Sequence, residues 1–366
     1  MGSTGTAASA CPEAAHERRS ASDATGGALL GACAAWALIT AGVHGGSPEG
    51  VLLAVLAVAA GYAGGRICGA LLPVAAPCAG ALTGLGLAVA APRLTLTPSS
   101  PLGHTGATAA LLILSAGAAC CAAWAARTPS LRLALRLLAA GIAGAAAALG
   151  SPVGCAGSVV VLLCSLAAAR LRNRALGIVG LAAASVLVTG VSLALADDSL
   201  PEGLTAPLEG SIGHHRVVLW QDALNLAERE PAMGVGPGRF GDVSPVAADA
   251  LVTDGKPHSA PLQQASEQGI VGAALLAAVF CWLLYALWRS PGSTQVVLSA
   301  GAALTALTAV AAVGNALSVT TVTTGAGLLA GMATARPLHA GHEGEPTHPA
   351  RTRHRAPGRQ VNPTCP

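Results

Sequence analysis

The residues with the clearest chemical potential lie in one polar stretch, residues 211–272. Within it, Arg216 precedes Trp220 by about one helical turn, and glycine then occupies every second position from Gly234 to Gly238. Arginine carries a permanent planar charge that suits anionic ligands, and a glycine-rich turn can aim backbone N–H groups at an anion. A plain turn that needs positive φ is the alternative for the glycines. The stretch therefore predicts an anion site with Arg216 as its fixed charge.

Two titratable residues follow, around the start of a helix that we expect to begin near Pro261. His258, just before that helix, is placed to titrate or to meet an anion, although a cap or a plain surface residue is the alternative. Glu267 can share a helix face with Gln263, and a carboxylate near the bilayer edge is costly when it is unpaired. We therefore treat His258 and Glu267, together with Arg216, as candidate catalytic residues.

This polar stretch interrupts an otherwise apolar chain. Of the 17 acidic residues, 11 lie between Asp197 and Glu267, and none lies between Val51 and Ala196. The chain has 366 residues, of which 53% are hydrophobic and 10% are charged, and its mean hydropathy is +0.61. Soluble domains carry about 25% charged residues, so the composition excludes a soluble globular protein. We expect the chemistry to take place in the one loop that holds the ionisable groups.

Apolar runs near the ~20 residues that cross a bilayer recur along the chain. They predict an all-α polytopic integral membrane protein with about ten transmembrane helices and one large extracytoplasmic loop that contains short helices. The expected spans are residues 28–43, 50–65, 67–91, 106–126, 131–150, 152–169, 175–196, 266–288, 295–313 and 317–335.

The distribution of basic residues orients these spans. With the N-terminus in the cytoplasm, 15 of the 20 lysine and arginine residues fall on the cytoplasmic side and 5 on the outer side, as the positive-inside rule requires. Both termini are therefore expected in the cytoplasm and the long loop outside the cell membrane. The predicted divisions are a cytoplasmic tail (1–27), seven spans (28–196), the extracytoplasmic loop (197–265), three spans (266–335) and a disordered basic tail (336–366).

Two further patterns do not predict sites. The run from Gly236 to Gly241 matches the GxGxxG fingerprint, but that fingerprint requires a preceding strand, and here a helix is expected. The ten cysteines lie in apolar spans, beside them or in the tails without a CxxC pattern, so we read them as small buried hydrophobes. With no DxD motif and no cluster of metal-ligating residues, we expect a metal-independent protein without a cofactor. We expect membrane lipids, and no nucleic acid, among its partners.

Three motifs follow one another in the polar stretch. They are Arg-x3-Trp from Arg216 to Trp220, Pro-x2-Gly-x-Gly-x-Gly-x-Phe from Pro231 to Phe240, and His-Ser-x9-Gly from His258 to Gly269. In this order and spacing they resemble the O-antigen ligase and polymerase superfamily of bacterial membrane glycan transferases. The ligase signature continues with a threonine three residues after the last glycine, where this chain has Gly272. The resemblance is therefore to the superfamily more than to the ligase subtype.

The resemblance implies a glycosyltransferase of cell-surface polysaccharide biosynthesis. Such enzymes move a glycan from a polyprenyl diphosphate carrier, such as undecaprenyl diphosphate, to a glycan or lipid acceptor on the outer face of the membrane. A diphosphate leaving group gains negative charge in the transition state, which Arg216 can bind bidentately. His258 can serve as general base or hydrogen-bond the phosphate, and both roles stay open. The remaining candidate substrate-binding residues are Arg239, Lys256, Trp220, Gly236 and Gly238.

Other functions stay possible at this level. A polysaccharide polymerase of the same superfamily would differ from a ligase only in its acceptor. A transporter would need ionisable residues inside the spans, which have almost none. A non-catalytic membrane scaffold is the third alternative.

Overall fold

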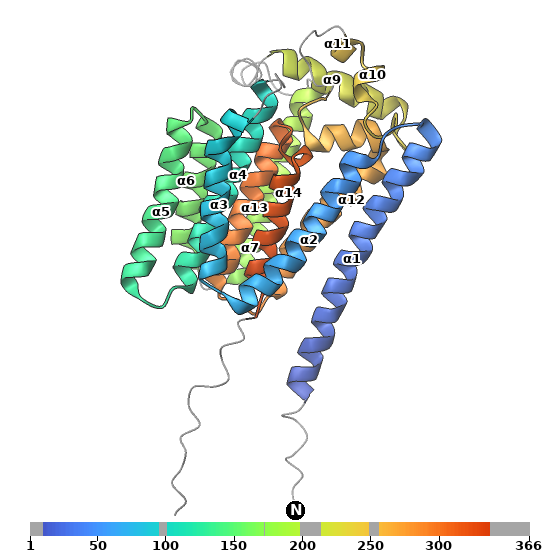
Figure 1. The fold of residues 1–366 in the computed structure, drawn as a ribbon. Coiled ribbons are helices and arrows are strands. Elements are labelled where there is room, and N and C mark those ends of the chain that lie inside the picture. Colours follow the sequence, from blue (N-terminus) through green and yellow to red (C-terminus); the bar gives the residue numbers. More distant parts are fainter. Residues whose placement is uncertain (1–9, 95–100, 172, 198–213, 249–255, 337–366) are drawn as a thin grey trace, which may run out of the picture.

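The computed structural model describes residues 10–94, 101–171, 173–197, 214–248 and 256–336, and all regular elements in these ranges are helices (Figure 1). Their bounds are α1 (Ala10–His44), α2 (Glu49–Leu71), α3 (Ala75–Leu94), α4 (Pro101–Ala125), α5 (Pro129–Ala148), α6 (Pro152–Ala167), α7 (Arg174–Ala196), α9 (His214–Arg229), α10 (Phe240–Val243), α11 (Pro245–Ala248), α12 (Ala260–Arg289), α13 (Thr294–Val313), the 3-10 helix η1 (Ala316–Ser318) and α14 (Thr320–Thr334).

Helices occupy the positions of the predicted spans. Seven of them are long and apolar enough, by length and composition, to cross a membrane, namely Ser22–His44 of α1, α2, Gly106–Ala125 of α4, α5, α7, α12 and α13. The apolar stretches Ala75–Ala90 of α3 and Pro152–Ala167 of α6 are shorter. The all-α multi-pass membrane class is therefore confirmed, and the number of about ten spans stays a prediction beyond these seven.

Several helices extend past the predicted boundaries, and α2 runs through the junction expected at residue 66 as far as Leu71. α1 begins at Ala10, inside the segment predicted as a cytoplasmic tail, and α12 begins at Ala260, inside the predicted loop. Short helices, α9 to α11, do lie within that loop. The predicted disordered tail falls almost entirely on residues 337–366, which lie outside the described residues.

Local signals set several helix ends. Gly150 takes a φ of 69° after α5, a left-handed conformation that ends helices and favours glycine. Ser151 then caps α6, because its hydroxyl accepts a hydrogen bond from the N–H of Gly154 at 3.3 Å and a proline follows at the start of the helix. At the end of α12, Arg174 donates to the carbonyl oxygens of Leu287 at 2.5 Å and Ser290 at 2.9 Å. A cation at a helix C-terminus satisfies free carbonyls and favours the helix dipole.

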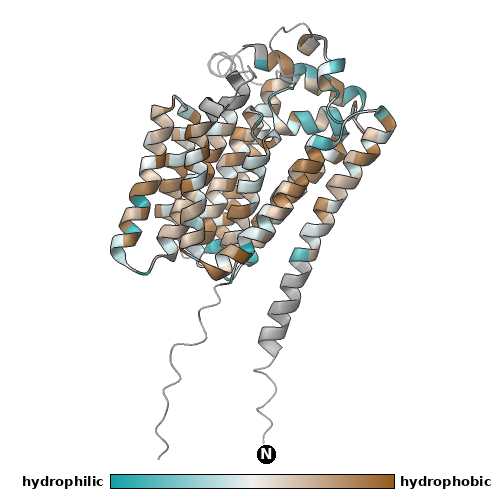
Figure 2. Ribbon diagram, viewed as in Figure 1, coloured by the Kyte–Doolittle hydropathy of each residue, from teal (hydrophilic) through white to brown (hydrophobic). Residues whose placement is uncertain are grey.

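The centre of the bundle is formed by α4 and α13. Of the most apolar window of each helix, 83% of α4 and 67% of α13 is buried, against 33% or less for the other five candidate spans. The outer helices instead expose large apolar side chains, such as Val186 (73%), Leu187 (67%) and Leu176 (66%). Figure 2 shows hydrophobic residues along the whole length of the bundle. An exposed apolar belt of this kind fits a lipid environment.

The backbones of α2 and α14 lie in direct contact at several glycines. A Cβ atom at Gly61 would lie 2.3 Å from the carbonyl oxygen of Thr324, and one at Gly331 would lie 2.2 Å from that of Tyr62. Small residues permit such contacts, which drive helix association where water supplies no hydrophobic force. Because only the short helix η1 separates α14 from α13 along the chain, this contact links α2 to the centre of the bundle.

The polar elements gather at one end of the molecule. Figure 1 shows α9, α10 and α11 together at the end of the bundle where α12 begins, which we call the loop end. Hydrophilic residues are prominent at this end in Figure 2. The eight described cysteines are all free. Cys120 and Cys121 are buried in the bundle core as predicted, but Cys68 and Cys281 are exposed, so the prediction of buried cysteines is wrong for these two.

The predicted orientation of the chain can be tested directly. A cysteine at Glu228, an exposed position on α9, should react with a membrane-impermeant maleimide in intact cells, whereas one at the exposed Ser130 should not. The reason is the excess of arginines on the side predicted to be cytoplasmic. The unmodified chain, treated identically, gives the background from its native cysteines. Labelling of Ser130→Cys but not of Glu228→Cys would place the loop in the cytoplasm and contradict the orientation.

Candidate functional site

The loop helices enclose a hydrophobic cluster of their own. Trp220 of α9, Phe240 of α10 and Leu262 of α12 each expose 0% of their surface. The rest of the cluster is Leu195, Ala196, Val217, Leu219, Ala223, Leu226, Val235 and Ala247. Arg216 and Trp220 do lie one turn apart on a helix, α9, and the inward face of this helix includes Val217 and Trp220. This core fixes the described part of the loop, and a site needs such rigid support for its side chains.

α12 is broken near its start. Gly269 has a φ of 68° and a ψ of −169°, which are not helical angles, and glycine adopts them at little cost. The break separates a first segment, residues 260–268, from the span that continues to Arg289. Carbonyl groups just before a break lose their helical donors and need other partners when they are buried. Ser266, Glu267 and Gln268, just before the break, are all buried.

Residues 231–239, which we call the glycine turn, supply two of these partners. The backbone N–H of Val235 donates to the carbonyl oxygen of Ser266 at 2.9 Å, and that of Gly236 donates to the carbonyl oxygen of Glu267 at 2.9 Å. Two irregular segments thus satisfy each other's backbone, as buried polar groups require.

Two further bonds complete the junction. The N–H of Ile270, just past the break, donates to the carbonyl oxygen of Pro231 at 2.9 Å. The carbonyl oxygen of Gln268 accepts from the indole Nε1 of Trp36, on α1, at 3.0 Å. The break in α12 is therefore held from two sides, by the glycine turn and by α1.

Glycine is required on both sides of this contact. A Cβ atom at Gly234, whose φ is 65°, would lie 2.5 Å from the carbonyl carbon of Glu267. A Cβ atom at Gly269 would lie 2.5 Å from the carbonyl oxygen of Ala232. Both distances are far below van der Waals contact, so the two backbones can meet only where side chains are absent.

The glycine turn donates a hydrogen bond to an acidic side chain of the protein itself. Glu267 is 3% exposed, and its carboxylate accepts hydrogen bonds from Gln263 Nε2 at 3.3 Å and from the backbone N–H of Gly238. Lys256, half-buried, adds a favourable Coulomb interaction. The helical pairing of Gln263 with Glu267 is thus as predicted. These contacts suit a carboxylate that shapes the turn, while its predicted catalytic role stays a prediction.

The position that departs from the ligase signature is also packed against this junction. A Cβ atom at Gly272 would lie 2.4 Å from Cβ of Gln268 and 3.1 Å from its Oε1. Gln268 is 2% exposed, and its Nε2 has no hydrogen-bond partner among the described residues. The Gln268 side chain therefore occupies the space that a larger residue at 272 would need.

Arg216 lies at the start of α9 and is half-buried. Its Nη1 donates to the carbonyl oxygen of Val313, the last residue of α13, at 3.1 Å. Burial lowers the pKa of the guanidinium, but arginine keeps its charge at neutral pH. Its Nε is buried with no hydrogen-bond partner, and no carboxylate pairs with it in the described ranges. Arg216 therefore brings to the loop end a partly desolvated positive charge that no carboxylate of the described residues pairs with.

His258 lies at the helix entrance, as predicted. It is 2% exposed, and among the described residues it is the one non-glycine residue with positive φ, at 53°. Such a conformation costs about 1–3 kcal/mol and persists where the surroundings impose it. Ser259 follows as the N-cap of α12, and its buried hydroxyl has no hydrogen-bond partner among the described residues. His258 is thus fixed at the positive end of the first segment of α12.

The predicted substrate-binding residues fall into two groups. Trp220 is fully buried in the loop core and Gly236 is buried in the junction with α12. Arg239 and Lys256 are half-buried, and Gly238 is exposed. Nη1 of Arg239 donates to the carbonyl oxygen of His44 at 2.6 Å. Trp220 and Gly236 could therefore contribute to binding only indirectly. Arg239, Lys256 and Gly238 are accessible to a ligand.

Sequence reasoning missed the contribution of the first hairpin of helices. The turn after α1 contacts the glycine turn, because the N–H of Ser47 donates to the carbonyl oxygen of Pro237 at 2.9 Å. Trp36 and His44 also touch the site, and about 190 residues or more separate them from their partners along the chain. No local periodicity signals such a contact. Ser244, buried, donates to the carboxylate of Asp222, which lies 22 residues earlier, and this contact was missed as well.

No group of three or more His, Cys, Asp or Glu side chains gathers in the described ranges. The predicted metal independence stays a prediction, since residues 198–213 and 249–255 lie outside those ranges. The rejection of the GxGxxG match fits the fold, because α9 precedes it and the described chain has no strand there.

Comparisons with known proteins identify one similarity. The family model described as O-antigen ligase matches residues 94–277, which is half of the chain and contains the glycine turn, the break in α12 and all the candidate residues. No curated protein and no solved structure matches the chain.

The junction between the glycine turn and α12 can be tested by Gly269→Ala. An alanine must adopt a left-handed φ, at ~1–2 kcal/mol, and its Cβ must also displace the Ala232 carbonyl. We expect a lower melting temperature in detergent and a lower folded yield. Gly180→Ala on α7 is the matched control, because its Cβ would meet nothing within 4 Å. Equal melting temperatures for the two variants would show that the close contact does not exist.

Proposed function

Because the chain belongs to the O-antigen ligase family, we propose that it transfers a glycan from a polyprenyl diphosphate carrier to an acceptor on the outer face of the cytoplasmic membrane. The multi-pass membrane architecture supports a lipid-linked donor, since a polyprenyl chain stays in the bilayer while its head group reaches the loop end. The product is a cell-surface polysaccharide or glycolipid.

The half-buried charge of Arg216, which no described carboxylate pairs with, carries this proposal. A half-buried guanidinium without a carboxylate partner in the described ranges is costly unless it has an anionic ligand. Nη1 holds the group against the end of α13, which leaves the rest of its planar fork to bind phosphate oxygens. In a partly dehydrated site such a fixed charge stabilises developing negative charge far better than water does.

The proposed step is a displacement at the anomeric carbon of the donor glycan. The bond from that carbon to the diphosphate oxygen breaks, and its electron pair leaves with the diphosphate. A bond forms from the acceptor oxygen or nitrogen to the same carbon, and the acceptor loses its proton. Arg216 stabilises the leaving diphosphate, and Arg239 and Lys256 supply further positive charge at the loop end.

His258 is the proposed partner for the acceptor or the phosphate. Its position at the N-terminal end of α12 suits contact with an anion, and a neutral imidazole could instead take the acceptor proton. For Glu267 we propose a supporting role, because Gln263 and the N–H of Gly238 already engage its carboxylate.

The orientation completes the proposal. We infer that the loop end faces outward and that both termini are cytoplasmic, on the strength of the arginine asymmetry. Ligation and polymerisation share the proposed step and differ only in the acceptor. A transport function receives less support, because the residues singled out lie at one end of the bundle and not along a path through it.

Arg216→Lys tests the site. Lysine keeps the charge but loses the bidentate fork, so transfer from a polyprenyl diphosphate donor in proteoliposomes should fall about 30-fold to 1000-fold, the equivalent of ~2–4 kcal/mol of barrier. The rate of glycan transfer is measured against protein amount.

The control is Arg229→Lys, an exposed arginine at the other end of the same helix, which should transfer at the normal rate. Near-normal turnover in Arg216→Lys would reduce Arg216 to a cap of α13 and remove the main support for the proposal.

A further inference from the structure

α1 lies at the edge of the bundle, where it packs against α12 and α2 (Figure 1). Only 22% of its apolar window is buried, and Leu38 and Val43 expose 54% and 60% of their surfaces. Burial of apolar surface does not hold a helix to its neighbours within lipid. The place of α1 must therefore depend on close contacts and on a few polar ties.

Two tryptophan N–H groups tie α1 to α12. Nε1 of Trp282, on α12, donates to the carbonyl oxygen of Ser22 at 2.9 Å, and Nε1 of Trp36, on α1, donates to that of Gln268 at 3.0 Å. From Ser22 to Trp36 is 14 residues, as it is from Gln268 to Trp282. The two bonds thus share one antiparallel register and lie about 21 Å apart along the helices.

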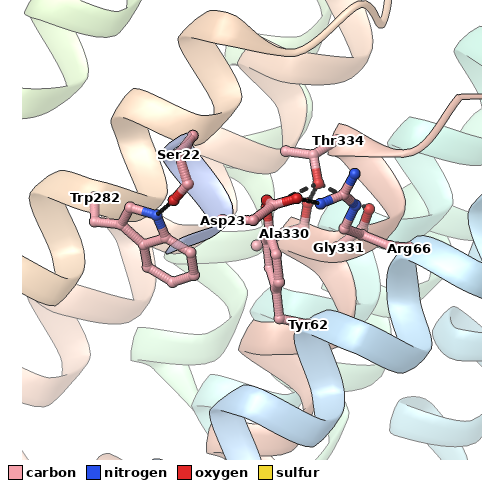
Figure 3. Close-up of polar contacts among 8 residues, drawn as sticks. All are labelled: Ser22, Asp23, Tyr62, Arg66, Trp282, Ala330, Gly331 and Thr334. Atoms are coloured by element: carbon pink, nitrogen blue, oxygen red, sulfur yellow. Dashed lines mark hydrogen bonds and ion pairs between the residues drawn. The ribbon is translucent and has the colours of Figure 1, made fainter. Parts of the chain in front are cut away.

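At the end far from the loop, α1 is also held to α2. Figure 3 shows Asp23 of α1 in an ion pair with Arg66 of α2, whose guanidinium lies 5.9 Å from the centre of the Tyr62 ring. The Tyr62 ring in turn lies 5.0 Å from that of Trp282. This cluster fastens α1 at the end of the bundle opposite the candidate site.

At the loop end, α1 and the turn after it touch both halves of the site scaffold. Trp36 holds the carbonyl next to the break in α12. The carbonyl oxygen of His44 accepts from Arg239, and the N–H of Ser47 donates to the carbonyl oxygen of Pro237. α1 is thus the one helix of the first hairpin that bonds directly to the break.

We propose that Trp36 is a positioning residue for glycan transfer, a role that rests on the proposed function. Its N–H supplies the partner that Gln268 lost at the break in α12, and so fixes the direction of residues 260–268. That segment carries Glu267 and follows His258 and Ser259 directly. Trp36 contacts no reacting atom and acts only through this segment.

Loss of the N–H leaves a buried carbonyl without a partner. The Gln268 peptide group can then lower its free energy by rotating toward another donor, such as a backbone N–H in the next turn of α12. The break at Gly269 shifts with it. A buried group without its hydrogen bond is costly to retain, so the segment samples several positions. Transfer needs its reacting groups in one arrangement, and a small displacement slows the chemical step more than it weakens binding.

The test is Trp36→Phe in the full-length protein in proteoliposomes. Phenylalanine keeps an aromatic ring and removes the N–H. We expect kcat to fall about threefold to tenfold with KM for the lipid-linked donor unchanged, and amide hydrogen exchange of residues 266–271 to accelerate. If Trp36→Phe does not fold, Trp36→Leu, whose side chain also has no hydrogen-bond donor, replaces it with the same expectations.

Asp23→Asn is the matched control, because it removes a tie of α1 at the opposite end of the bundle. It should leave both kcat and the exchange of residues 266–271 at their normal values. An equal fall in kcat for Asp23→Asn would show that α1 acts only by staying attached, and would overturn the proposal. Normal kcat and normal exchange in Trp36→Phe would overturn it as well.

Failure of the proposed function has a different signature. The unaltered protein would then transfer no glycan from any polyprenyl diphosphate donor, whatever its residue 36. Faster exchange of residues 266–271 in Trp36→Phe, but not in Asp23→Asn, would still support the tie to the break. Unchanged exchange would refute it independently of activity.

Discussion

The close contact between two irregular backbones is the constraint on which the rest of the loop end depends. The break in α12 at Gly269 frees buried carbonyl groups, and the glycine turn supplies N–H groups to the carbonyl oxygens of Ser266 and Glu267. Neither segment could bury its backbone alone, because an unpaired buried polar group is costly. Side chains are excluded from the contact at Gly234 and Gly269. The spacing of these glycines therefore has a structural cause in this chain in addition to any chemical one.

This contact also determines where the candidate site residues lie. Because the first segment of α12 is separated from the rest, its N-terminal end can present His258 at the loop end, while the rest of α12 is apolar enough to cross a bilayer. The glycine turn carries Arg239, and its N–H at Gly238 engages Glu267. Arg216 comes from a different direction, at the junction of α9 with the end of α13. Arg216, the proposed ligand of the diphosphate, is thus held against the end of α13 in the bundle, whereas His258 is held by the first segment of the broken helix α12.

Much of this could be predicted from the sequence, and the reasons are local. Apolar runs and their lengths locate the helices. Proline explains why α9 ends before Pro231 and why α12 begins near Pro261, because proline disrupts a helix interior but is favoured in the first turn. The roles of Gly234 and Glu267 could not be predicted, because a glycine-rich turn near an anion does not reveal that the anion is a side chain of the same protein. Trp36 gave no signal at all, since its partner lies 232 residues away and a backbone carbonyl has no sequence pattern.

The most direct test of the central claim is the release of polyprenyl diphosphate by the purified protein in proteoliposomes. The donor is a polyprenyl diphosphate glycan, offered with a glycan or lipid acceptor on the loop side. If the protein transfers the glycan, one polyprenyl diphosphate is released for each new glycosidic bond, and none is released when the acceptor is absent. A folded protein that moves the intact donor across the bilayer, or that binds it without breaking the bond to the diphosphate, would contradict the account.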